Sequence, residues 1–139
     1  MVIRHLKIGS LVARFRKVLS PATGQPGTTS RDMAFLAHVR EVVRLHIADP
    51  YYTTRSAAAD LTISRMHLNR RLRTVTGMST HEFIRTIRLD TAYEILLHTD
   101  IPVSAIAARV GYKSVSHFAQ AFRERFGATP AQCRLLPRP

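Results

Sequence analysis

The hydrophobic pattern is clearest between Ser79 and His98. Apolar residues recur there at helical spacing and form one wide stripe: Phe83, Ile84, Ile87, Leu89, Ala92, Ile95, Leu96 and Leu97. Ser79 and Glu82 have the spacing of a capping box, in which the hydroxyl and the carboxylate each bond a backbone N–H at the start of a helix. The pattern therefore predicts a helix over residues 79–98.

The sequences on either side of this helix repeat each other. Residues 58–63 correspond to residues 107–112 at an offset of 49, and residues 68–77 correspond to residues 118–127 at an offset of 50. A one-residue insertion in the turn accounts for the change of offset. Each copy is expected to form a short helix, a tight turn and a second helix, which is the helix-turn-helix pattern.

Caps and turn residues predict where the other helices begin and end. The expected helices are 32–48, 54–61 after Thr53, 65–75 after Ser64, 103–110 after Pro102, and 114–126, which Gly127 ends. Thr129 forms a second capping box with Gln132, and Pro130 stands at the first helical position of a last short helix. Strand signals are nearly absent, so we expect an all-α fold.

Residues 1–30 stand apart from this pattern. They carry five basic residues and no acidic residue, with an amphipathic stripe that predicts a loosely attached helix and a linker rich in Pro and Gly. Three interpretations fit: a membrane-surface helix, an extra arm that would contact DNA, or a remnant of a neighbouring domain, which the core-like stripe favours. Residues 31–139 are expected to form a double helix-turn-helix domain, with subdomains 31–77 and 100–134 joined by the connecting helix 79–98.

Charge narrows the classes of function. The chain has 139 residues, the length of one domain, with a formal charge of +12 and a pI of about 11.4. Such a balance is typical of proteins that bind nucleic acid or an anionic membrane surface. No apolar run of about 18 residues occurs, so no membrane span is expected. The single Cys133 cannot form an internal disulfide, which fits a reducing compartment, and we expect the cytoplasm.

Patterns for catalysis and for metal binding are missing. His81 and Glu82 begin a zinc-peptidase motif, but Arg85 stands where the second histidine is needed. The seven histidines are scattered without cysteine pairs, and neither a phosphate-binding glycine loop nor a GxSxG nucleophile turn occurs. Asp90 and Glu94 lie one helical turn apart and are interpreted as an acidic surface pair. No enzyme activity, metal or cofactor is therefore expected.

Several fragments carry a family resemblance over roughly residues 32–134, among them IAARVGYKSVSHFAQAFRERFGATPAQCR, LNRRL and FIRTIRL. Together they resemble the DNA-binding domain of the AraC/XylS family, in the form found as the output domain of hybrid two-component regulators. LKIGSLVARFRKVL resembles the last helix of a phosphoacceptor receiver domain. Where the family usually has glycine in the first turn, this chain has Thr62. The resemblance implies a monomer that sets two recognition helices, 65–75 and 114–126, into adjacent major grooves.

Side-chain chemistry at outward positions predicts the contacts to DNA, and the family pattern supports the base contacts other than Arg65. The candidate base contacts are Arg65, Met66, Asn69, Arg70, Val115, Ser116, His117 and Gln120. Arginine forks onto guanine, asparagine pairs with adenine, and an apolar tip packs against the thymine methyl group. The candidate phosphate contacts, which position the protein without reading sequence, are Arg71, Arg73, Arg85, Lys113 and Arg123.

These observations predict a sequence-specific DNA-binding transcriptional regulator whose partner is double-stranded DNA. RNA polymerase and an upstream receiver or sensor domain are further candidate partners. Two alternatives stay open: a nonspecific basic nucleic-acid-binding protein, and a helical protein-interaction module. The affinity of a nonspecific binder would depend on salt alone and show no sequence preference. Competition between target and random duplex at fixed salt therefore distinguishes it from a sequence-specific DNA-binding protein.

Overall fold

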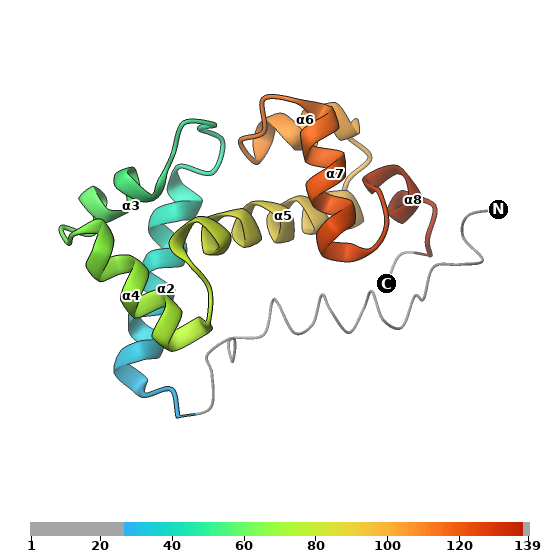
Figure 1. Ribbon diagram of the computed structural model, residues 1–139. Coiled ribbons are helices and arrows are strands. Elements are labelled where there is room, and N and C mark those ends of the chain that lie inside the picture. The colour runs from blue at the N-terminus through green and yellow to red at the C-terminus, as the bar shows by residue number, and fades with distance from the viewer. Residues whose placement is uncertain (1–26, 138–139) are drawn as a thin grey trace.

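The computed structural model describes residues 27–137, and this part of the chain contains helices and no strand. The helices are α2 (Ser30–Leu45), α3 (Thr54–Asp60), α4 (Arg65–Thr76), α5 (Thr80–His98), α6 (Val103–Arg109), α7 (Val115–Phe126) and α8 (Pro130–Arg134). α5 lies at the centre, with α2, α3 and α4 at one end and α6, α7 and α8 at the other (Figure 1). We call residues 30–76 the first head and residues 103–134 the second head. The all-α fold class is confirmed, whereas the amphipathic segment expected before residue 27 lies outside the described residues.

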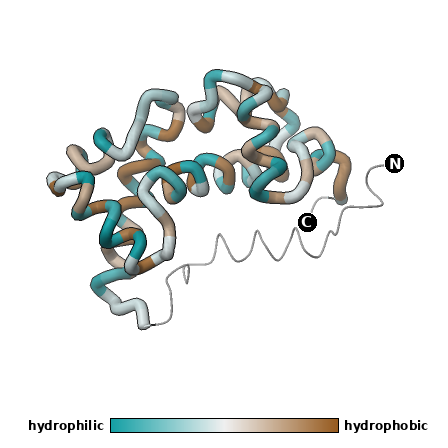
Figure 2. Tube along the Cα trace, in the orientation of Figure 1, coloured by the Kyte–Doolittle hydropathy of each residue, from teal (hydrophilic) through white to brown (hydrophobic). Residues whose placement is uncertain are grey.

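α5 begins at its predicted capping box. Ser79 Oγ accepts a hydrogen bond from the N–H of Glu82 at 3.1 Å, and Glu82 Oε2 accepts one from the N–H of Ser79 at 2.9 Å. Ten of the 19 residues of the helix are buried, and they include polar residues beside the expected apolar stripe. Hydrophobic and hydrophilic positions accordingly alternate along α5 (Figure 2). The helix is therefore enclosed by both heads.

α5 divides its buried apolar side chains between two hydrophobic cores. The first core joins residues of α2, α3 and α4 to Phe83, Ile84 and Ile87. The second joins residues of α6, α7 and α8 to Leu89, Ala92, Tyr93 and Leu96. The border between the two cores falls at Arg88, which the apolar pattern left out.

The internal repeat is present in the hydrogen bonds of the two turns. The N–H of Ile63 bonds to the carbonyl of Ala58 at 3.0 Å, and the N–H of Tyr112 bonds to the carbonyl of Ala107 at 2.9 Å. Both pairs are related by the offset of 49, whereas the caps of the following helices are related by 50. The inserted residue is therefore Lys113.

The second helix of each copy begins and ends in the same way. α4 and α7 each have 12 residues. Ser64 and Ser114 cap their starts, each accepting a bond from the N–H three residues on at 3.0 and 3.3 Å. Gly77 and Gly127 end them in the left-handed conformation with φ of 79° and 83°, where a side chain would be strained. The predicted caps Ser64 and Gly127 are confirmed, whereas Ser114, expected to be the first helical residue, is itself the cap of α7.

The two turns differ at one residue that has a positive φ. Thr62 has φ of 57°, and the equivalent Gly111 has φ of 83°. A residue with a side chain loses roughly 1–2 kcal/mol in this conformation. Thr62 is exposed, so its side chain has room. A Cβ on Gly111 would lie 1.7 Å from Arg88 Nη1 and 2.5 Å from the carbonyl oxygen of Ile47, so the second turn also needs glycine for space.

α2 differs from the expected helix 32–48 at both ends. It starts two residues earlier because Thr29 and Asp32 form a capping box, with both hydrogen bonds at 3.1 Å. It ends at residue 45 because the N–H of His46 bonds to the carbonyl of Val43, three residues back, at 3.1 Å. Such a bond closes a tighter turn than an α-helix. The chain therefore leaves the helix three residues before the expected end at residue 48, ahead of Asp49 and Pro50.

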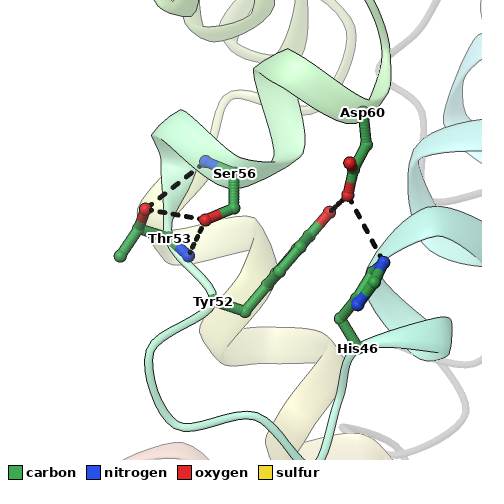
Figure 3. Close-up of polar contacts among 5 residues, drawn as sticks. All are labelled: His46, Tyr52, Thr53, Ser56 and Asp60. Carbon is green, nitrogen blue, oxygen red and sulfur yellow. Dashed lines mark hydrogen bonds and ion pairs between the residues drawn. The ribbon is translucent and has the colours of Figure 1, made fainter.

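Polar contacts between His46, Tyr52 and Asp60 join the end of α2 to the end of α3 (Figure 3). The hydroxyl of Tyr52 donates to Asp60 Oδ2 at 2.8 Å, and His46 Nε2 lies 3.4 Å from the same oxygen. The two rings stack with centroids 4.7 Å apart. Burial and the bond to Asp60 raise the pKa of Tyr52, so the phenol remains a donor. Thr53, which caps α3 in a box with Ser56, follows directly.

Candidate nucleic-acid interface

α4 carries most of the charged candidate base contacts on its exposed face. Leu68, Leu72 and Val75 face the first core, and the exposed residues of α4 include the candidates Arg65, Met66, Arg70 and Arg73. Met66 is 77% exposed, so its whole apolar tip is available to a partner. This surface can present guanidinium forks to guanine edges and an apolar tip to a thymine methyl group.

Asn69 has a structural partner that the sequence did not predict. Its Oδ1 accepts a hydrogen bond from the backbone N–H of Thr80 at 3.0 Å, and the side chain is half-buried. The bond satisfies one of the free N–H groups at the start of α5. A bidentate contact to adenine needs the same oxygen. In this structure that oxygen is already hydrogen-bonded to Thr80, and the bond joins α4 to α5.

Arg71 faces α2 and not the surface that carries Arg70. Its guanidinium lies 4.0 Å above the ring of Phe35 and 3.8 Å from Asp32. One residue along an α-helix turns the side chain by about 100°, which takes Arg71 away from its exposed neighbour. The expected phosphate contact is thus engaged inside the first head.

α7 presents small and polar side chains. Its exposed candidates are Val115, Ser116, His117, Gln120 and Arg123. Val115 is 45% exposed, and Gln120 Nε2 lies 3.5 Å from Glu124 Oε1 on the next turn. This surface therefore carries fewer charges than the surface of α4.

Arg85 of α5 is paired with an acidic residue of α7. Arg85 Nη2 lies 2.5 Å from Glu124 Oε2, and this hydrogen bond raises the pKa of Arg85. The pair neutralises a carboxylate that would otherwise face an anionic ligand. Arg85, a candidate phosphate contact, is therefore engaged in the unbound protein.

Lys113, in the turn of the second head, contacts the first head. Its Nζ is 3.8 Å from the centroid of the Tyr51 ring, which is a cation–π contact. Both residues are exposed, so the ammonium group keeps an open side. The residue inserted in the second turn thus reaches the loop that connects α2 to α3.

A hollow of about 610 Å³ lies between the two heads. It is lined by Pro50, Tyr52, Thr53, Thr54, Arg55, Arg65, His81, Ile84, Arg85, Arg88, Gly111, Tyr112, His117, Gln120, Ala121 and Glu124. Candidate base contacts from both heads therefore share one concave surface, with Arg65 on one side and His117 and Gln120 on the other. The remaining exposed candidates do not line the hollow.

Asp90 is buried and is not part of an acidic surface pair. It is 7% exposed and holds the guanidinium of Arg125. Burial raises the pKa of Asp90 to about 6, against the opposing effect of Arg125. Glu94 remains exposed. The interpretation as a surface pair was wrong because helices pack against α5 on more than one of its faces, and one of the covered faces carries Asp90.

Arg88 is a second buried charge that sequence reasoning missed. It is 7% exposed. Its two terminal nitrogens donate to the carbonyl oxygens of Ile47, Asp49, Tyr52 and Val110. The available signal was the pair of charges in the segment RLD, which interrupts a run of apolar residues.

Within residues 27–137, no three His, Cys, Asp or Glu side chains come together as a metal site requires. In the same part of the chain, none of the helices combines the length and apolar character needed to cross a membrane.

Comparison with known proteins identifies relatives of the whole helical region. A family model described as a helix-turn-helix domain matches residues 57–135. The chain is 30% identical over 135 residues to the HTH-type transcriptional regulator YfiF of Bacillus subtilis, covering 96% of this chain and 42% of that protein. It is 33% identical over 101 residues to the transcriptional activator NphR of a Rhodococcus species, covering 71% and 29%. Histidine kinase P4 of Formosa agariphila is 28% identical over 88% of this chain and 9% of its own length. The chain thus spans between 9% and 42% of these relatives.

Solved structures of helix-turn-helix regulators are similar to this chain in fold. The C-terminal domain of AraT, a response regulator from Geobacillus stearothermophilus, matches with a TM-score of 0.67 and 30% identity over 78% of this chain and 86% of that chain. The DNA-binding domain of AdpA, solved in complex with a target DNA, matches with a TM-score of 0.65 and 29% identity over 71% and 88%. An AraC-type regulator from Chromobacterium violaceum, at 24% identity and a TM-score of 0.69 over 76% and 94%, shares the fold. The chain belongs to the AraC-type helix-turn-helix domain family.

Proposed function

We propose that this chain is the sequence-specific DNA-binding part of a transcriptional regulator. The observation that carries the proposal is the placement of two capped 12-residue helices at opposite ends of α5, with Arg65 and Gln120 facing one hollow. At a rise of 1.5 Å per residue, α5 is about 28 Å long. Successive major grooves on one face of DNA lie about 34 Å apart. One chain is therefore long enough to set a helix into each of two neighbouring grooves.

We assign the contacts by what each side chain is free to do. The base contacts are Arg65, Met66 and Arg70 of the first head, and Val115, Ser116, His117 and Gln120 of the second. The phosphate contacts are Arg73, Lys113 and Arg123, whose charged tips are exposed. Asn69 and Arg71 are left out because each has a partner within the protein. Arg85 offsets the negative charge of Glu124 as the backbone of DNA approaches.

The two heads contribute unequally in this proposal. α4 offers two arginines to base edges, and a good bidentate contact is worth about 1–3 kcal/mol of discrimination. α7 offers amide, hydroxyl and imidazole groups, which bond bases singly. The first head therefore supplies most of the base selection, and the second head supplies additional contact and orientation.

The proposal includes a place for the domain in a longer regulator. AraT is a response regulator and one relative is a histidine kinase, and the chain covers a small part of most relatives. A receiver or sensor domain would supply the signal, and contact with RNA polymerase would convert DNA binding into a change of transcription. The proposed action is binding without a catalytic step, in the cytoplasm.

Selection of bound sites from a random pool of duplex DNA tests the function. The expected result is an enriched motif of two blocks whose centres are about one helical turn apart. Competition between this motif and random duplex at fixed salt should then favour the motif by about 10³-fold or more. Equal competition would identify a nonspecific nucleic-acid binder, and absence of DNA binding would favour a protein-interaction module.

A further inference from the structure

We propose that Arg88 fixes the distance and angle between the two heads, and so decides which spacing of the two DNA blocks the protein accepts. The inference rests on the proposed function, because it concerns the same interface. It assigns Arg88 as a positioning residue, which selects DNA through the arrangement of the heads and does not touch the bases.

The first observation is the set of hydrogen bonds made by one guanidinium group. Nη1 donates to the carbonyl oxygens of Ile47 at 2.5 Å and Val110 at 2.7 Å. Nη2 donates to those of Asp49 at 2.9 Å and Tyr52 at 3.4 Å. The guanidinium is planar and its donors have a fixed arrangement. The four carbonyl groups are therefore held in one geometry relative to each other.

These carbonyl groups belong to different heads. Residues 47–52 connect α2 to α3 in the first head, and Val110 ends the first helix of the second head. Arg88 itself stands on α5 between Ile87, which packs into the first core, and Leu89, which packs into the second. The side chain thus joins the two heads at the border between their cores.

Burial makes this arrangement resistant to displacement. Arg88 is 7% exposed, and burial lowers its pKa from the ordinary value. It nevertheless stays charged at neutral pH, because arginine normally loses its proton far above pH 7. A buried charge is costly unless its hydrogen bonds are made. If one head moved, a buried guanidinium would lose partners, so the bonded arrangement is favoured.

The turn of the second head is packed against this group. A Cβ on Gly111 would lie 1.7 Å from Arg88 Nη1. Glycine is therefore needed at residue 111 both for its φ and for the approach of the guanidinium. Displacing either group displaces the other.

A fixed arrangement has a measurable effect on DNA. One inserted base pair moves the second block by about 3.4 Å along the axis and rotates it by about 35°. Two rigidly joined heads cannot both follow this change, and the gain from simultaneous binding, often 10²-fold or more, is lost. Heads joined loosely would accommodate it.

The experiment compares three full-length proteins: wild type, Arg88→Met and the matched control Arg134→Met. Arg134 is a half-buried arginine whose guanidinium likewise donates to carbonyl groups, those of Ile101 at 2.6 Å and Thr99 at 3.4 Å. Both of its partners lie between α5 and α6, on the side of the second head. Affinities are measured for the selected site, for versions with one base pair inserted or removed between the blocks, and for a single block.

We expect wild type and Arg134→Met to prefer the selected spacing by at least about 10-fold. Arg88→Met should reduce this ratio by at least about 5-fold while binding a single block as wild type does. An unchanged ratio in Arg88→Met, or an equal reduction in Arg134→Met, overturns the proposal. If circular dichroism shows that Arg88→Met is unfolded, Arg88→Lys, which keeps the buried positive charge but lacks the planar fork of donors, is held to the same criteria.

The results also separate this inference from the proposed function. A wild-type protein that binds selected and random DNA equally overturns both. A wild-type protein that binds the selected blocks but tolerates the insertion overturns the role of Arg88 alone.

Discussion

Asp90 of α5 accepts two hydrogen bonds from the guanidinium of Arg125 in α7, at 2.7 and 3.1 Å. Removing the arginine would leave a carboxylate buried in the core. Arg125→Met is therefore expected to lower the free energy of unfolding at pH 7 by about 3 kcal/mol. Urea denaturation measures this loss, with Arg123→Met as the exposed control on the same helix, for which we expect a change within about 0.5 kcal/mol. Similar losses in both variants would mean that the pair contributes nothing specific.

The raised pKa of Asp90 makes a prediction about pH. Burial raises this pKa from 3.8 to about 6, so the folded protein binds the proton more tightly than the unfolded chain. The contribution of Asp90 to stability should then fall as the pH rises from about 4 to about 6. The difference in unfolding free energy between wild type and Asp90→Asn, measured across this range, isolates the effect from other carboxylates. A difference that increases with pH would show that Arg125 outweighs burial.

Arg70 and Arg73 lie one turn apart on α4 and should behave differently. Arg70→Ala is expected to cost about 1–3 kcal/mol on the selected site and to leave binding to random duplex almost unchanged. Arg73→Ala should weaken binding to both and lower the slope of log affinity against log salt by about one. Gel-shift titrations at several salt concentrations measure both effects. Equal losses for Arg70→Ala on both duplexes would assign Arg70 to a phosphate.

The strained turn of the first head can be relieved. Thr62→Gly is expected to raise the free energy of unfolding by about 0.5–1 kcal/mol, because glycine adopts a positive φ without the strain that Thr62 bears. The exposed bond from Thr62 Oγ1 to the carbonyl of Leu61 is a small loss. Gly111→Ala serves as the opposite control and should be destabilising. Thermal unfolding measures the stability of both variants relative to wild type. A lower stability for Thr62→Gly would mean that the turn is not strained.

Asn69 should act on stability and not on base choice. Asn69→Ala removes the acceptor for the N–H of Thr80 and is expected to lower the free energy of unfolding by about 1 kcal/mol. Its effect on binding should be the same for the selected site and for a site whose adenines are replaced. If the variant loses affinity only where an adenine is present, Asn69 does read bases.

Much of the fold could be predicted because its signals are local. A cap such as Ser79 acts on a residue three positions away, and Gly127 ends a helix through its own φ. Because the two copies correspond residue by residue, a helix or turn predicted in one copy was also predicted in the other. The change of offset also indicated that the second turn has one additional residue. The start of α2 was predicted two residues too late because the capping box of Thr29 and Asp32 was overlooked, although its spacing is visible in the sequence.

The contacts that were missed join residues far apart in the chain. Arg88 and Ile47 are separated by 41 positions, Asp90 and Arg125 by 35, and Asn69 and Thr80 by 11. No periodicity indicates which distant carbonyl or carboxylate a charged side chain will meet. An exposed arginine and one that stacks on a neighbouring helix look alike in sequence, which is why Arg70 and Arg71 were both predicted to contact DNA, Arg70 at a base and Arg71 at a phosphate.

The division of α5 between two cores has a consequence for how the repeat can change. A cut between Ile87 and Leu89 would leave each half with all the α5 side chains of its own core. The two copies are joined instead by the continuous backbone of α5, by Ile47, which packs against both cores, and by the bonds of Arg88. Substitutions inside one core can therefore accumulate without disturbing the other, whereas changes at Ile47 or Arg88 affect both copies.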